Sequence, residues 1–447
     1  MKKTLIIVAA ALCLVACRQA VECSVPAFVE DGAIVLKAPD RAPGQISALK
    51  LACEPIDTVR VGFVGVGSRG RGALHRYAAL EGARIAAICD LYQPQLDKAA
   101  ELLDSKGVSG VKQYVGADGY KLLCEDPDID LVYICTDWKM HTPVAVYAME
   151  HGKHAAIEVP AAMSIAECWL LVDTCEKTRR HCMMLENCCY DFFELLALNM
   201  KQHGLFGEVY YGEGAYIHNL DDFWDRYQDN WRLEYDWKYR GDNYPTHGIG
   251  PLCQVFDIHR GDRMDYVVSQ DTESYRGLAA AKERMGVDEF ADGDHTVSLI
   301  RTVNGHLIQI QHNVYGMRPY NRKFELSGTL GYAVKYPSQN FAFGHRGFVS
   351  PEEFAALSEQ YKFDFVREIE EQARKVGGHG GMDYIMDYRL IRALRLGLPL
   401  DEDVYDAAEM SCLVELSRIS LEHGSMPVKV PDFTRGDWNV IDGFRYE

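Results

Sequence analysis

Four features are missing from this 447-residue sequence, and each absence excludes a class of protein or site. No stretch reaches the roughly 18 consecutive apolar residues that a membrane-spanning helix needs. No run of lysine and arginine occurs and the formal net charge is −18, so no nucleic-acid partner is expected. The 14 cysteines include no C-x-x-C pair, and the acidic stretch 221–236 lacks the spacing of a calcium loop, so no metal site is predicted. What remains is a globular composition, 48% hydrophobic and 25% charged, with room for two or three domains.

The N-terminus has the pattern of an export signal. Two lysines precede an apolar stretch that is too short to cross a membrane but has the length of a signal-peptide core. It ends in "LVAC", which resembles the lipobox of bacterial lipoproteins, where Cys17 would be lipidated and become the mature N-terminus. We therefore predict a signal peptide at 1–16 and a lipidated tether with a lead-in strand at 17–56. The protein would be an exported bacterial lipoprotein, periplasmic or at the cell surface, and held to the membrane only through Cys17. The alternative is an uncleaved apolar N-terminus.

Beyond the tether, the order of strand-like and helical segments changes once along the sequence. Up to about residue 185, strand-like segments such as "VRVGFVGVG", "ARIAAICD" and "DLVYICT" alternate with helical ones, which predicts an α/β, doubly wound parallel sheet. After residue 187, strand-like segments follow one another across turns such as Asn304-Gly305, and from Pro351 the pattern is helical. We predict a Rossmann domain at 57–185 and an α+β domain with an open, largely antiparallel sheet at 186–447. We expect the C-terminal helices to pack back on the rest.

The first strand of the Rossmann domain leads into a dinucleotide-binding turn. Gly65, Gly67 and Gly70 have the G-x-G-x-x-G spacing, and the helix that they open offers free amides to a pyrophosphate. Asp90 closes the next strand, where it can bond a ribose 2′-hydroxyl, so the sequence favours NAD over NADP. Arg69, close to the turn, weakens that preference slightly. The alternative is that the glycines only tighten the turn.

Two loops at the carboxyl edge of the predicted sheet extend the pattern. They contain "CTDWKMHTP" and "IEVP", and with the glycine turn they resemble the oxidoreductase family named after glucose–fructose oxidoreductase, inositol dehydrogenase and MocA. The resemblance covers about residues 57–447 and implies a Rossmann domain followed by an α/β domain with an open sheet. Most dehydrogenases of that family carry Glu-Lys-Pro where this sequence has Glu158-Val159-Pro160, and the missing lysine argues against a plain dehydrogenase.

A more specific resemblance accounts for that departure. The motifs "TDWKMHTP", "IEVPAA", "ENCCYDFFEL", "GEGAYIHNL" and "YPTHGIGP" occur in this order and are similar to those of glycoside hydrolase family 109. This is a bacterial group of NAD-dependent α-N-acetylgalactosaminidases in which NAD stays bound and is not consumed. The resemblance implies that NAD would be contacted by Ser68, Arg69, Asp90, Trp138, Lys139, Met140, His141, Glu158, Val159 and Asn187. It implies that the sugar pocket would be lined by Tyr216, Arg232, Tyr244, Pro245, Thr246, His247 and Tyr320, with Arg232 and Tyr244 also near the cofactor.

The mechanism that the resemblance implies runs through a transient ketone. Hydride leaves C3 of the sugar for NAD, the C2 proton is removed, the aglycone leaves C1, water adds, and the hydride returns. Such a path needs proton acceptors near C3 and C2, and not the paired carboxylates of ordinary glycosidases. We expect His247 and Tyr244 in acid–base roles, with Tyr190 as helper; which residue handles which proton stays open. Each has a structural alternative: a hydrogen-bonding histidine, a packed tyrosine, or for Arg232 a surface ion pair with the nearby acids.

Three hypotheses on function follow from the sequence. The first is an NAD-dependent glycosidase that acts on glycans or glycosides with α-linked N-acetylgalactosamine or a related sugar. The second is a sugar or cyclitol dehydrogenase of the same fold, which would release NADH. The third is a non-enzymatic, sugar-binding lipoprotein. Export favours the first, because a cofactor that is reoxidised in each turnover needs no replacement outside the cytosol. The oligomeric state, including a homo-oligomer, stays open.

Overall fold

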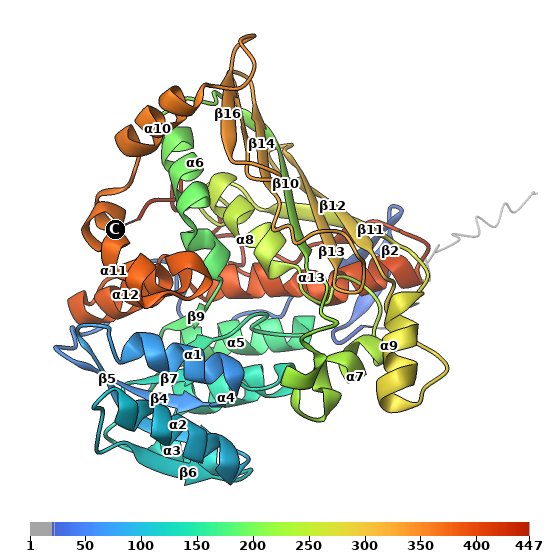
Figure 1. Ribbon diagram of the computed structural model, residues 1–447. Helices are drawn as coiled ribbons and strands as arrows, with labels where there is room; N and C mark the ends of the chain where they lie inside the picture. The colour runs from blue at the N-terminus through green and yellow to red at the C-terminus, as the bar shows by residue number, and fades with distance from the viewer. Residues whose placement is uncertain (1–19, 22, 447) are drawn as a thin grey trace, which may run out of the picture.

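The chain forms two sheets with helices between and around them (Figure 1), as seen in a computed structural model that describes residues 20, 21 and 23–446. The predicted signal peptide and Cys17 lie outside the described residues. Within the described part, no helix combines the length and the apolar content that crossing a membrane requires. One sheet has six strands and the other eleven.

The six-stranded sheet is the predicted Rossmann sheet. Its order is β6-β5-β4-β7-β8-β9, and every neighbouring pair is parallel. Its central strands are apolar without alternation because helices cover both faces. The strands are β4 (Val59–Val64), β5 (Ala83–Asp90), β6 (Lys112–Val115), β7 (Leu131–Ile134), β8 (His154–Ile157) and β9 (Cys182–Met184). The helices are α1 (Ser68–Tyr77), α2 (Gln93–Ser105), α3 (Gly119–Glu125), α4 (Trp138–Glu150) and α5 (Ile165–Thr178).

The larger sheet is mostly antiparallel, which confirms the predicted fold class. Its order is β1-β2-β3-β17-β11-β12-β13-β10-β14-β15-β16, with parallel pairs at β10 with β13 and at β17 with β3. The turn between β12 and β13 places Gly305 at φ +94°, a conformation that favours glycine. The strands are β1 (Ala20–Val21), β2 (Ala27–Glu30), β3 (Ala33–Leu36), β10 (Val209–Ile217), β11 (Met264–Asp271), β12 (Thr296–Thr302), β13 (Leu307–Asn313), β14 (Phe324–Gly328), β15 (Gly331–Val334), β16 (Asn340–Phe343) and β17 (Val428–Lys429).

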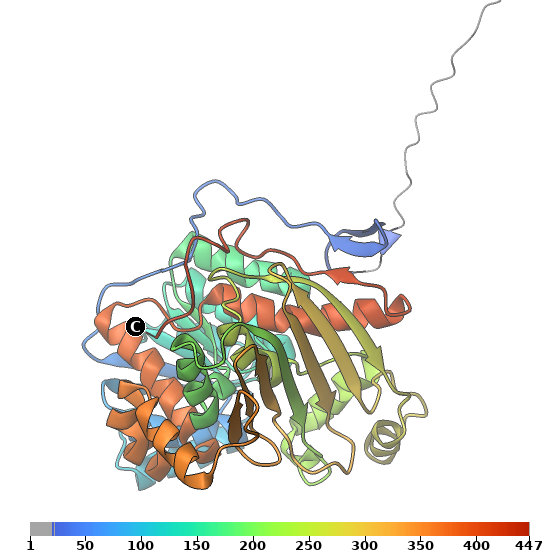
Figure 2. The same ribbon diagram turned by 90° about the horizontal axis from the view of Figure 1, so that it is seen from above.

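Part of the range expected as a tether belongs to this sheet. The hairpin of β2 and β3 pairs with β17, so a segment near the N-terminus lies beside one near the C-terminus (Figure 2). Just before the hairpin, the Ser24 side chain donates a hydrogen bond to Glu415 at 2.6 Å. The stretch between β10 and β11 holds helices that the sequence pattern did not predict, α7 (Trp231–Lys238) and α8 (Thr246–Val255).

One buried helix joins the two sheets. Helix α13 (Val404–Glu422) is buried along nearly its whole length and packs against α5 on one side and β11 on the other. Its polar side chains bond both partners: Glu415 accepts from the Ile165 amide at 2.7 Å, and Ser420 from the Ser269 amide at 3.0 Å. The remaining helices are α6 (Phe192–Gln202), α9 (Arg276–Met285), α10 (Pro351–Gln360), α11 (Asp364–Val376) and α12 (Met382–Leu396), of which α12 contacts α1. Helices α12 and α13 therefore pack on the Rossmann domain.

Candidate functional site

The three glycines of the turn between β4 and α1 meet three different demands. Gly65 has φ +86°, and a β-carbon there would lie 2.5 Å from the Cys135 carbonyl oxygen. A β-carbon at Gly70 would overlap the Gly65 carbonyl oxygen, so this residue lets the helix approach the strand. A β-carbon at Gly67 would have no described atom within 4 Å. Gly67 thus faces open space in front of the helix, where a pyrophosphate can approach the backbone.

The groups around this open space fit a dinucleotide. Helix α1 begins at Ser68 without a side-chain cap and without an acid in its first turn. Its first backbone amides are therefore free to bind an anion, with no carboxylate nearby in the helix to repel it. Asp90, at the end of β5, accepts from the Val66 amide at 2.9 Å and from the Tyr92 amide at 3.0 Å. These two bonds hold its carboxylate beside the turn, where it has lone pairs left for ribose hydroxyls.

Two of the predicted cofactor residues meet at an acid that the sequence analysis missed, and a third joins them through Arg69. Asp383, on α12, accepts from Arg69 Nη1 at 2.7 Å and from Asn187 Nδ2 at 2.6 Å. Arg69 Nε also donates to Glu158 Oε1 at 2.6 Å. Burial raises the pKa of Asp383, but Arg69 and Arg76 outweigh it and hold the pKa well below its usual range. Asp383 therefore holds the Arg69 side chain against the substrate domain. No motif marks it, and only the packing of α12 on α1 brings it here.

The "WKMH" segment contributes less through its side chains than expected. Lys139 is exposed and pairs with Asp137 at 3.1 Å, and Met140 is half-buried against the core. His141 is buried, with its ring nitrogens 2.7 Å from the Pro160 carbonyl and 3.2 Å from the Thr136 carbonyl. His141 thus links the two loops at the sheet edge. Lys139 and His141 have these other partners, so the backbone at the start of α4 is the part of this segment that is free to face a cofactor.

Trp138 lies in an aromatic cluster between the two domains. The centre of its ring lies 5.1 Å from that of Trp231, 5.3 Å from that of Tyr235 and 6.0 Å from that of Tyr244, on which it stacks. Val159, after β8, is buried next to Glu158. The cluster closes the substrate domain onto the carboxyl edge of the Rossmann sheet.

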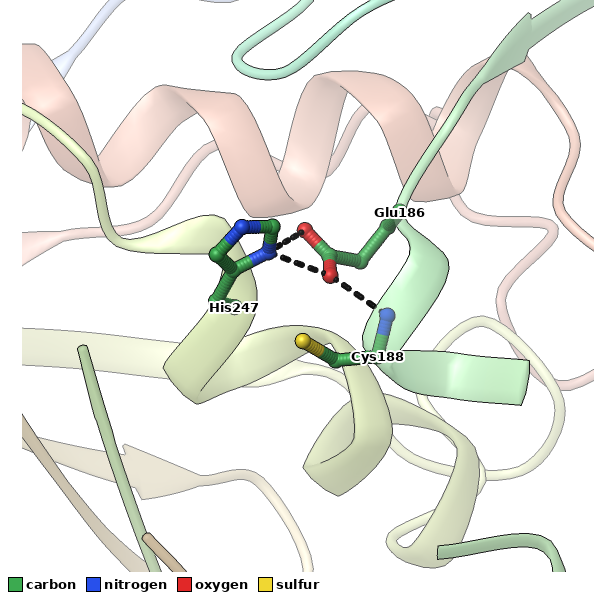
Figure 3. A group of neighbouring side chains, drawn as sticks. All are labelled: Glu186, Cys188 and His247. Carbon is green, nitrogen blue, oxygen red and sulfur yellow. Dashed lines mark hydrogen bonds and ion pairs between the residues drawn. The ribbon is translucent and has the colours of Figure 1, made fainter. Parts of the chain in front are cut away.

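The centre of the site is a histidine held by a buried glutamate (Figure 3). His247 is the second residue of α8, and its Nδ1 lies 2.7 Å and 3.0 Å from the two oxygens of Glu186, which follows β9. The Cys188 amide donates to Glu186 at 3.0 Å. Burial raises the pKa of Glu186, but His247 and these hydrogen bonds outweigh it and lower the pKa. The second ring nitrogen of His247 lies on the side away from Glu186. This pair is the arrangement of a general base and the acid that orients it.

Sequence reasoning missed Glu186, although it opens the quoted motif "ENCCYDFFEL". The available signal was its position: an acid directly after the last parallel strand lies at the ligand-binding edge of the sheet. Pro245 and Thr246 form the start of α8, and Thr246 is fully buried. They set the direction of His247.

Arg232, on α7, is a buried guanidinium with free donors. The residue is 4% exposed, its Nη1 donates to the Tyr227 hydroxyl at 3.0 Å, and its Nε and Nη2 have no hydrogen-bond partner in the described part of the chain. The guanidinium lies 4.6 Å from the centre of the Tyr244 ring. This is not the surface ion pair considered as an alternative. Buried donors without partners are costly, so their presence indicates a ligand.

Two tyrosines and a second histidine complete the pocket. The Tyr216 ring lies 4.9 Å from Tyr244 and 5.2 Å from His247, and its hydroxyl is 2.9 Å from His218 Nδ1. The half-exposed Tyr320 contacts the His218 ring at 4.8 Å. Burial, and then Arg232, lower the pKa of His218 to about 4, so this imidazole is neutral at pH 7. The quoted motif "GEGAYIHNL" contains His218, but the sequence analysis did not select it.

The structure bears on both tyrosines that were expected in acid–base roles, and it places Tyr190 elsewhere. Burial raises the pKa of Tyr244 well above its usual value, and the nearby Arg232 lowers it too little to compensate, so Tyr244 keeps its proton. Tyr190, expected as a catalytic helper, is fully buried, with its hydroxyl 3.4 Å from Asp401 and its ring against Tyr446. The short turn of residues 187–190 sends Asn187 to Asp383 and Tyr190 into the core, so Tyr190 does not join the His247 pocket.

Family models match both domains. The model described as glycosyl hydrolase 109, C-terminal domain, matches residues 190–440, and the oxidoreductase family model with an NAD-binding Rossmann fold matches residues 59–186. The chain is 53% identical over 432 residues to a glycosyl hydrolase family 109 protein of Porphyromonas gingivalis, covering 92% of each chain. It is 51% identical over 432 residues to such a protein of Bacteroides thetaiotaomicron, again covering 92% of each.

Solved structures share the fold at low sequence identity. A levoglucosan dehydrogenase in complex with NADH matches with a TM-score of 0.62 and 18% identity, covering 84% of this chain and 100% of that one. The WlbA dehydrogenase of Bordetella pertussis, in complex with NADH and UDP-GlcNAcA, matches with a TM-score of 0.63 and 15% identity, covering 85% and 100%. With the glycine turn, Asp90 and the His247 pocket, these comparisons show that the chain belongs to glycosyl hydrolase family 109 and that its cofactor is NAD.

Proposed function

We propose that this chain hydrolyses α-linked N-acetylgalactosamine or a related sugar by transient oxidation at C3, elimination across C1 and C2, water addition and re-reduction. The observation that carries the proposal is the His247–Glu186 pair, which shares the Tyr244 ring as a neighbour with Arg232, whose Nε and Nη2 have no hydrogen-bond partner in the described part of the chain. Family membership supports glycosidase chemistry, and the NAD-binding domain supports a redox step within it. Bound NAD supplies a reversible hydride acceptor.

His247 is the proton acceptor for the sugar hydroxyl. Glu186 bonds Nδ1, so the ring carries a proton there and offers the lone pair of Nε2 to the substrate. When Nε2 takes the proton, the buried carboxylate stabilises the positive imidazolium that forms. The pair is built in two parts: β9 and its loop hold the acid, and the first turn of α8 holds the base.

Arg232 and Tyr244 act on charge that develops at the sugar oxygens. The free Nε and Nη2 donors of Arg232 suit an enolate oxygen, since preorganised donors in a buried site stabilise such charge strongly. Tyr244 keeps its proton and therefore acts as a hydrogen-bond donor. His218, whose Nδ1 lies beside the Tyr216 hydroxyl, is a neutral imidazole, and its lowered pKa makes it a weaker proton acceptor than an ordinary histidine.

The two glutamates nearest the site are already engaged. Glu158 is bound by Arg69, and Glu186 by His247. Direct displacement at C1 uses two carboxyl groups that flank the glycosidic bond and face the sugar. The pairing of both acids in the site therefore favours elimination over displacement. A residue other than lysine at position 159 favours it over net dehydrogenation.

A substrate panel tests the proposal. The NAD-loaded protein is assayed against α- and β-linked p-nitrophenyl sugars, with NADH absorbance followed in parallel. We expect p-nitrophenol release from the α-linked N-acetylgalactosamine compound without net NADH formation, and a loss of about 10²-fold or more in His247→Ala. Stoichiometric NADH release would support the dehydrogenase instead. Binding of the sugar with no turnover by any variant would support the non-enzymatic alternative.

We also propose that the protein is anchored at Cys17. The support is the apolar stretch and the "LVAC" motif. Expression in a bacterial host with a labelled fatty acid should label the wild type and leave Cys17→Ser unlabelled and released from the membrane fraction. A labelled Cys17→Ser protein would refute this assignment.

A further inference from the structure

Three side chains with different donor atoms surround one point in the site. Glu186, Cys188 and His247 each offer a ligand atom, and these atoms all lie within 4.8 Å of one another. Figure 3 shows the Cys188 sulfur, the Glu186 carboxylate and the His247 imidazole converging from the turn after β9 and from α8. The cysteine and glutamate are buried, and 11% of the His247 side chain is exposed. The sequence analysis predicted no metal site because it searched for ligands at fixed spacing, and these ligands come from two distant segments.

The donor set suits a zinc-type cation. Zinc binds thiolate sulfur at about 2.3 Å and imidazole nitrogen or carboxylate oxygen at about 2.0–2.2 Å, usually with four ligands. Tetrahedral ligands at such distances are separated by about 3.3–3.7 Å, which the 4.8 Å limit accommodates. Nδ1 and the nearest Glu186 oxygen are 2.7 Å apart because a proton bridges them, so a small rotation of the carboxylate must open this contact.

The surrounding charges allow such an ion. A thiolate at Cys188 and the carboxylate of Glu186 together balance a divalent charge, so the loaded site is neutral and needs no further buried acid. Burial and then Glu186 raise the pKa of the Cys188 thiol well above its usual value, and Arg322, whose Nη1 lies 3.6 Å from the sulfur, offsets this only in part, so the bound cation itself must stabilise the thiolate. His247 is the least buried member of the group, so a cation would reach the site from its side.

We propose that Glu186, Cys188 and His247 form an inhibitory site for Zn²⁺ and related divalent cations, with Nδ1 of His247 as the nitrogen ligand. Nothing in the reaction needs this ion. Its ligands are the proton acceptor, the acid that orients it, and a cysteine without a part in the chemistry. Three protein ligands leave a fourth position for water from the pocket.

Metal binding would switch off the base by moving a proton. In the form that accepts a proton from the substrate, the His247 ring carries its single proton on Nδ1. A cation on Nδ1 displaces this proton, which moves to Nε2, while the Cys188 thiol releases its proton to solvent. Nε2 then carries hydrogen and has no lone pair for the sugar hydroxyl. This consequence rests on the proposed role of His247, whereas binding of the cation does not.

Cobalt tests the binding step without reference to activity. Full-length, NAD-loaded protein is titrated with Co²⁺, and the thiolate-to-cobalt charge-transfer band and the visible bands of tetrahedral Co²⁺ are followed. Wild type should develop both, and Zn²⁺ should abolish them by exchange. Cys188→Ser should lack the charge-transfer band, while Cys189→Ser, which removes the adjacent buried cysteine, should keep it. A wild-type spectrum without the band, or one unchanged in Cys188→Ser, overturns the proposal.

Activity then tests the inhibitory role. Zn²⁺ should lower kcat of the wild type at unchanged KM, and a chelator should restore kcat. Cys188→Ser should show basal activity close to that of the wild type. The variant should need at least about tenfold more Zn²⁺ for the same inhibition. Should Cys188→Ser fold poorly, Cys188→Ala and the chelator reversal carry the same comparison. Cobalt binding without inhibition would confirm the site but overturn its inhibitory role. Absence of glycosidase activity in metal-free wild type would instead count against the proposed function.

Discussion

Alanine in place of two glycines of the same turn should separate cofactor binding from stability. At Gly67 the backbone has φ −62° and a β-carbon enters open space, so Gly67→Ala should change the free energy of unfolding by less than about 0.5 kcal/mol. The methyl group occupies the space where the pyrophosphate approaches the backbone, so NAD affinity should fall at least about tenfold, or ~1.4 kcal/mol.

Gly65→Ala should behave in the opposite way. Its φ of +86° costs about 1–2 kcal/mol for alanine, and the 2.5 Å approach to the Cys135 carbonyl adds about 1–3 kcal/mol of overpacking. We expect a loss of roughly 3 kcal/mol in stability. Gly107→Ala is the matched control, because its φ is +72° with open space around it, and it should lose only the conformational part.

The assays are urea unfolding of NAD-free protein and calorimetric titration with NAD. The reasoning fails if Gly67→Ala binds NAD as tightly as wild type, since the open space would then not receive the pyrophosphate. It also fails if Gly65→Ala is no less stable than Gly107→Ala, since the contact with Cys135 would then carry no cost.

Three further predictions address the site and its support. Glu186→Gln should lower kcat about 10²- to 10⁴-fold with little change in KM, because the amide neither fixes the His247 tautomer nor stabilises its positive form; steady-state kinetics on the best panel substrate measures this. Asp383→Asn should lower the free energy of unfolding by about 3 kcal/mol, because Arg69 and Arg76 lose a buried carboxylate. It should also reduce the amount of NAD retained on purification. Unchanged values in urea unfolding and in cofactor extraction would contradict this prediction. Burial raises the pKa of Asp242 to about 7. Between about pH 4 and pH 7 the folded state therefore binds more protons than the unfolded state. The free energy of unfolding then falls as the pH rises, by up to about 1.4 kcal/mol per pH unit. Asp242→Asn removes this dependence, so urea unfolding should show the variant gaining on wild type from pH 5 to pH 8, and parallel pH curves would refute the assignment.

The Rossmann half was predictable because its signals are local. Apolar runs such as "LVYI" indicate that both faces of a strand are covered. The glycine spacing indicates where the turn bends and that a pyrophosphate can approach its backbone. Asp90 follows from its place at the end of a strand. The same local reading predicted β10 to β14 of the second sheet, including the hairpin at Gly305, but not β15, β16 or β17.

The missed residues depend on contacts far apart in the chain. Asp383 reaches the cofactor edge only because α12 packs on α1, and nothing near it in the sequence signals that contact. Tyr190 and Glu186 share one motif, but the turn that follows β9 directs Glu186 to the site and Tyr190 into the core. The burial of Tyr244, which decides its protonation, is likewise a property of the closed interface with Trp138.

Helix α13 also affects the order in which the chain can fold. Until residues 404–422 have been synthesised, α5 and β11 each lack the helix that joins the two sheets, and the hairpin of β2 and β3 must wait for β17. Contacts of such long sequence separation make folding slow, because the intervening chain must be ordered before they form. The parts of the chain that pack on α13 and β17 can therefore complete their packing only near the end of synthesis.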